Sequence, residues 1–142
     1  MGSAMIATRQ RGSTLVSRLT WFEIHAEEPA RAMRFYAGLF GWSFDSFGDD
    51  YWLIRTGDPA QPGIDGGLLP RRGPSPPEGQ PVNAYTCVVS VADVDDAVAK
   101  IPALGGAIAV AKFAVPSVGW LAYARDPEGN LFGVMTMDER AS

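Results

Sequence analysis

The chain has 142 residues, 46% of them hydrophobic, and a mean hydropathy near zero, which fits one globular domain and excludes a disordered chain. Its 16 acidic and 12 basic residues give a formal charge of -4 without a basic cluster, so a nucleic acid partner is not expected. A single cysteine excludes an internal disulfide framework, and no apolar run reaches the roughly 18 residues of a membrane span. We therefore expect a cytoplasmic protein with no membrane partner.

After residues 1–18, which we expect to be flexible, the first element is a strand. Side chains alternate from Leu19 to Ala26, which predicts Phe22 and Ile24 on one face of the strand. The other face then carries Trp21, Glu23 and His25. A helix is expected to start at Pro29, after Glu28 as N-cap, and to end at Gly41. Its apolar residues recur at helical spacing at Ala32, Phe35, Tyr36 and Leu39.

Three further strands are expected at 42–47, 51–57 and 64–70, which would complete a first module over residues 19–70. Residues 71–81, "RRGPSPPEGQP", contain four prolines in eleven positions and predict an exposed linker. The residues at 82–138 repeat the pattern, with a strand at 84–91, a helix capped by Asp93, and strands at 107–115, 119–125 and 131–136.

The two halves keep a constant offset. Glu28 and Asp93 are 65 positions apart, and so are Gly41 and Gly106. This spacing predicts an α+β fold of two tandem βαβββ modules, since one such module does not cover its own apolar face. We expect the modules to form an incomplete barrel with the helices outside and a concave interior.

Three segments resemble the vicinal oxygen chelate superfamily of glyoxalases, bleomycin-resistance proteins and dioxygenases: "FEIHAEEPARAMRFYAGLFGW", "VSVADVDDAVAKIPALGG" and "DPEGNLFGV". The resemblance implies a divalent metal held by the first and last strands of each module. In this chain those positions fall on Trp21, Thr86, Gly133 and either Leu68 or Gly67. None is a good ligand for a catalytic metal, so we expect no metal and no cofactor, as in the metal-free, drug-sequestering branch.

His25, the only histidine, shares a strand face with Glu23, and such a couple can transfer protons near pH 7. The alternative is that the two side chains have a structural or ligand-contact role. Ligand contacts are expected from six residues: Trp21, Thr86, Ser90, Trp52, Trp120 and Gly133. The alternation of side chains along a strand does not determine on which face of the sheet Trp52 and Trp120 lie.

The leading hypothesis is a homodimeric, metal-independent protein that binds an apolar or aromatic small molecule in its concave interior. A second hypothesis is a metal-independent lyase, isomerase or cyclase that uses His25 and Glu23 as an acid/base pair. A third is a glyoxalase-like enzyme with a divalent metal on relocated ligands.

Overall fold

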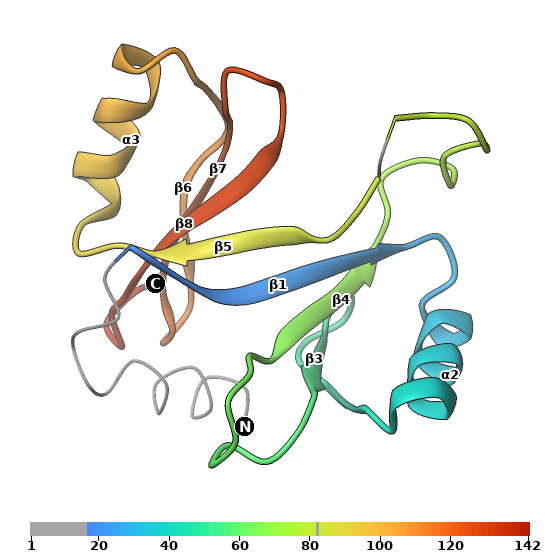
Figure 1. Ribbon diagram of the computed structural model, residues 1–142. Helices are drawn as coiled ribbons and strands as arrows, with labels where there is room; N and C mark the ends of the chain where they lie inside the picture. The colour runs from blue at the N-terminus through green and yellow to red at the C-terminus, as the bar shows by residue number, and fades with distance from the viewer. Residues whose placement is uncertain (1–16, 82) are drawn as a thin grey trace. The chain divides into compact units, whose positions relative to one another are not determined.

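A computed structural model describes residues 17–81 and 83–142. The segment 1–18, predicted to be flexible, lies outside the described residues except for its last two positions. The described chain forms two compact units, one made of residues 21–85 and the other of 17–20 with 86–142 (Figure 1).

The unit of residues 21–85 contains the first set of elements. These are β1 (Arg18–Ala26), which starts just before the unit, α2 (Pro29–Phe40), β2 (Ser43–Ser46), β3 (Trp52–Arg55) and β4 (Gly66–Pro70). The strands lie in the order β2-β3-β4-β1, with β1 parallel to β4 and the other pairs antiparallel. The last strand of the set therefore lies beside the first.

The other unit repeats this plan. Its elements are β5 (Thr86–Ser90), α3 (Val94–Ala103), β6 (Ala107–Val115), β7 (Gly119–Arg125) and β8 (Leu131–Met137). They follow the order β5-β8-β7-β6, again with one parallel pair, β5 with β8. The predicted α+β class and the repeated βαβββ order are thus confirmed.

Each unit has its own apolar core between its helix and one face of its strands. In the first unit the buried cluster is Phe22, Ile24, Ala26, Ile54 and Leu68. The prediction that Phe22 and Ile24 share one face of the strand is confirmed, and α2 residues pack on this face. In the second unit Val94, Ala122 and Val134 form the equivalent cluster.

The predicted apolar stripe of α2 is wrong in two positions. Ala32, Met33 and Tyr36 pack on the core, whereas Phe35 and Leu39 are 59% and 60% exposed. The helix presents the edge that carries residues 32, 33 and 36 to the sheet, which turns the other edge to solvent. The helix nevertheless ends as predicted, with Gly41 in the left-handed conformation at φ 73°.

The two helices begin differently. The carboxylate of Asp93 accepts a hydrogen bond of 2.9 Å from the backbone N–H of Asp95, which is an N-cap. Glu28 makes no side-chain cap, and its carboxylate pairs instead with Arg31 at 2.9 Å. Neither of these described helices is long and apolar enough to cross a lipid bilayer.

Candidate functional site

The sheet face of β1 that points away from α2 carries the predicted polar residues. Because side chains alternate along a strand, Trp21 and Glu23 lie on the opposite face from Phe22 and Ile24. Both are buried, with exposed fractions of 8% and 4%. A buried carboxylate requires hydrogen-bond donors around it, since an ion without them is unstable in an apolar environment.

A tyrosine that the sequence did not single out supplies one of these donors. The indole N–H of Trp21 donates to the hydroxyl oxygen of Tyr51 at 3.0 Å. That hydroxyl in turn donates to Oε2 of Glu23 at 2.9 Å. The phenol therefore links the tryptophan and the carboxylate in one chain of hydrogen bonds, in which the charged acceptor strengthens the second bond.

Tyr51 reaches this position because residue 67 is glycine. Gly67 on β4 is the register partner of Glu23 on β1. A Cβ built on Gly67 would overlap the hydroxyl and ring carbons of Tyr51. Tyr51 thus occupies the space that any side chain at residue 67 would need.

The strand register also corrects which residue of the first half is equivalent to Gly133 of the second. In the second unit Gly133 pairs with Val88, the position equivalent to Glu23. Gly67 is therefore the structural counterpart of Gly133, and Leu68, given by the constant 65-residue offset, faces α2 in the first core. The last strand of the first half is shifted by one residue relative to that offset, and a shift by one residue moves a side chain to the other face.

The four positions that the family uses for a metal do not fit a divalent cation. Trp21 presents an N–H donor, Gly67 and Gly133 have no side chain, and only Thr86 offers a neutral hydroxyl. Catalytic divalent metals require about three ligands such as imidazole, thiolate or carboxylate. In the described part of the chain no three His, Cys, Asp or Glu residues are grouped to hold a metal ion.

His25 lies at the end of β1, where opposing effects act on its ring. Burial lowers the pKa of His25 below 6.5, the Glu23 carboxylate raises it, and Arg71 and Arg72 lower it further. The net result is a lowered pKa, so the imidazole is mainly neutral at pH 7. The Arg71 guanidinium also donates to the backbone carbonyl of His25 at 2.8 Å.

Two of the tryptophans assigned to ligand contact lie on the helix-facing side of their sheets. Trp52 packs on the core beneath α2, opposite Leu68 in the register. Trp120 packs on the core beneath α3, donates to Asp138 at 3.1 Å and lies 4.9 Å from the amine of Lys112. The facing that strand parity left open is thus the helix side for both, whereas Trp21 and Gly133 lie on the opposite faces of their sheets.

The remaining assigned residues lie in the second unit. Thr86 and Ser90 are buried, with exposed fractions of 7% and 6%. Tyr123 pairs with Gly133, and its ring lies 3.3 Å from a Cβ built there. Tyr123, which the sequence did not assign to ligand contact, thus lies beside Gly133.

Comparison with known sequences identifies the family. The sequence matches the glyoxalase-like domain family over residues 21–135. It is 32% identical over 136 residues to a Mycobacterium bovis protein named "Putative glyoxylase CFP32", and equally to one of the same name from Mycobacterium tuberculosis. The match takes in 91% of this chain and 49% of the relative. The chain therefore spans about half the length of the curated relatives it matches.

Solved structures share the fold at low sequence identity. One is a glyoxalase/bleomycin resistance protein/dioxygenase superfamily member from Vibrio splendidus, with 14% identity, a TM-score of 0.59 and coverage of 84% of this chain and 97% of the other. Another is methylmalonyl-CoA epimerase from Mycobacterium tuberculosis, with 13% identity, a TM-score of 0.59 and coverage of 89% and 91%. At these identities the likeness shows the fold alone.

Proposed function

The chain belongs to the glyoxalase-like domain family, and we propose that it binds an organic small molecule with an apolar or aromatic body, without a resident metal. The binding surface is the sheet face defined by Trp21, Glu23 and Tyr51. The observation that carries the proposal is that residue 67, a metal-ligand position of the family, is glycine, and that the Tyr51 phenol occupies the space a side chain there would need.

The chemistry of this face supports an organic ligand. An indole and a phenol provide flat apolar surface, and their hydrogen bonds to one another fix their orientation. The Glu23 carboxylate accepts the Tyr51 hydroxyl and adds a polar group beside this apolar surface. The face therefore suits a ligand with an apolar or aromatic ring.

A neutral imidazole beside a carboxylate favours a second candidate function. The lowered pKa of His25 leaves its ring able to accept a proton at pH 7. In a metal-independent lyase, isomerase or cyclase, His25 would exchange the proton and Glu23 would stabilise the imidazolium that forms. Turnover abolished by His25→Gln, with binding retained, would distinguish this enzyme from a binding protein.

A fluorescent neutral probe tests the binding surface directly. N-phenyl-1-naphthylamine carries aromatic rings and an N–H group without a charge. We expect saturable binding that Trp21→Phe weakens about fivefold or more, because the substitution removes the hydrogen bond that orients Tyr51. Trp120→Phe, on the helix-facing side, is the matched control and should bind like the wild type. Equal affinities of all three proteins would contradict the proposal.

A further inference from the structure

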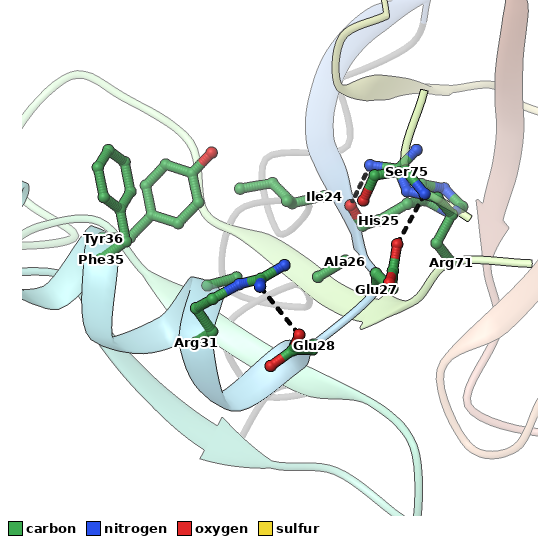
Figure 2. A pocket seen from close by; sticks show the side chains of 11 residues that line it. Ile24, His25, Ala26, Glu27, Glu28, Arg31, Phe35, Tyr36, Arg71 and Ser75 are labelled. Carbon is green, nitrogen blue, oxygen red and sulfur yellow. Dashed lines mark hydrogen bonds and ion pairs between the residues drawn. The ribbon is translucent and has the colours of Figure 1, made fainter. Parts of the chain in front are cut away.

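A cavity lies within the unit of residues 21–85, and neither Trp21 nor Tyr51 lines it. It has a volume of about 360 Å³ and is bounded by the end of β1, the first turns of α2 and the segment after β4 (Figure 2). This volume is at the lower end of the range for small-molecule sites, about 300 to 1,000 Å³. Neither the family resemblance nor the proposed binding surface accounts for it.

One wall of the cavity is apolar and partly rigid. Ile24 and Ala32 contribute aliphatic surface, and Phe35 and Tyr36 contribute rings that meet edge to face at 5.1 Å. The Tyr36 ring stacks on Trp42, with the ring centroids 5.3 Å apart, and its hydroxyl forms a 2.8 Å hydrogen bond with the hydroxyl of Tyr85. Phe35 is 59% exposed although it is apolar, so covering it with a ligand would remove apolar surface from water.

The opposite wall carries a guanidinium with unused donors. Arg71 donates to the backbone carbonyl of His25 at 2.8 Å and to the side-chain oxygen of Asn83 at 3.3 Å. Both acceptors are neutral. Arginine has five N–H groups, and the Nε–H of Arg71 is buried without an acceptor among the described residues. Among the described residues no carboxylate is hydrogen-bonded to this guanidinium. Each terminal nitrogen of Arg71 makes one of the two bonds above, which leaves one N–H on each of them for a planar anion.

Two acidic residues on the rim limit the charge of that anion. The carboxylate of Glu27 accepts a hydrogen bond of 2.8 Å from the backbone N–H of Ser75. Hydrogen bonding to Ser75 lowers the pKa of Glu27, and the positive charges of Arg31 and Arg71 lower it further. Glu28 pairs with Arg31 at 2.9 Å, as Figure 2 shows. The low pKa of Glu27 keeps a negative charge on the rim, which would repel a dianion such as a phosphate monoester more strongly than a monocarboxylate.

We propose that this cavity is a binding site for a small aromatic monocarboxylate. The carboxylate pairs with the Arg71 guanidinium, and the ring lies against Phe35 and Tyr36. A charge-assisted, bidentate contact of this kind is the strongest that arginine offers to a planar anion. The residues that define the surface proposed above for the neutral ligand, Trp21, Glu23 and Tyr51, do not line this cavity, although His25 does.

The test uses 4-fluorobenzoate as the probe and follows its fluorine NMR signal during titration of the full chain at pH 7 and low salt. We expect saturable binding that 4-fluorobenzamide, its neutral analogue, does not reproduce. Arg71→Gln should weaken the affinity about tenfold or more, since hydrogen bonds to charged groups contribute about 1.5 to 3 kcal/mol. Arg72→Gln, the adjacent exposed arginine, should bind like the wild type.

A second pair of variants covers the case in which Arg71→Gln disturbs folding. Phe35→Ala removes the exposed ring of the cavity wall and should weaken binding, whereas Leu39→Ala, equally exposed on α2 but outside the cavity, should not. Tyr51→Phe should leave 4-fluorobenzoate binding unchanged, which separates this site from the proposed function. No saturable binding, equal binding of the benzamide, or equal effects within each matched pair would overturn the proposal.

Discussion

The hydroxyl of Tyr51 lies where a side chain on Gly67 would begin, on the register partner of Glu23. In the other unit the equivalent Gly133 is bordered instead by a methyl of Val88, 3.1 Å from its built Cβ. The two halves thus share a glycine at the family's metal-ligand position on the last strand. A hydroxyl lies against this glycine in the first half, whereas carbon atoms of Val88, Tyr123 and Leu121 lie nearest to it in the second.

Gly67→Ala should destabilise the protein by about 1 to 3 kcal/mol, because the added methyl requires Tyr51 to move. Urea unfolding monitored by tryptophan fluorescence measures this change. Gly38→Ala is the control, since nothing lies within 4 Å of a Cβ built there on α2, and alanine is the better helix former. The steric account predicts a lower midpoint for the first variant and an unchanged or higher midpoint for the second. A Gly67→Ala protein as stable as the wild type would be incompatible with it.

Tyr51→Phe should cost about 1 to 3 kcal/mol of unfolding free energy, because it removes a hydrogen bond from the Glu23 carboxylate and the acceptor from the Trp21 indole. Tyr85→Phe also removes a hydroxyl hydrogen bond, but at an exposed site, and should cost less. The same urea experiment compares the two. Equal losses would show that the lower exposure of the Tyr51 hydrogen bonds adds nothing to their contribution.

Asp93→Ala should destabilise by about 0.5 to 2 kcal/mol, because it removes the N-cap of α3. Asp93→Asn keeps an acceptor oxygen and should recover most of the loss. Glu28→Ala, at the corresponding position of α2, should have little effect, since Glu28 forms an exposed ion pair and no cap. Circular dichroism during thermal unfolding ranks the stabilities of the three variants. A Glu28→Ala protein less stable than the Asp93→Ala protein would contradict the prediction.

The titration of His25 should make stability depend on pH in a defined direction. Its folded pKa is lower than 6.5, so the unfolded chain binds the proton more tightly. This contribution to stability is present above pH 6.5 and is lost as the pH falls through the lower, folded pKa. Because His25 is the only histidine, its ring proton resonances report the pKa in one NMR titration. In His25→Gln this part of the pH dependence should disappear; a measured pKa above 6.5 would reverse the sign.

Much of the fold was predictable because local rules determine it. Alternation along β1 gave the facing of Phe22 and Ile24, and the need for a left-handed residue gave the helix end at Gly41. The facing of Trp52 was not predictable. It depends on how β3 pairs with β4, and a shift by one residue reverses the face of every side chain on a strand.

The candidate site was predictable only in part, for the same reason. Glu23 and Trp21 follow from the parity of a single strand. Their link through Tyr51 depends on contacts between strands and on the absence of a side chain at Gly67, which no pattern along the chain encodes. The cavity beside Arg71 likewise depends on a loop that the proline-rich composition predicted only as a linker.

Native mass spectrometry of the protein freshly purified from its own host tests the central claim most directly. We predict a chain that retains no stoichiometric divalent metal after dialysis and that carries an organic molecule, whose occupancy falls in Trp21→Phe and is kept in Trp120→Phe. One tightly held divalent cation per chain, released by Glu23→Gln, would contradict the account.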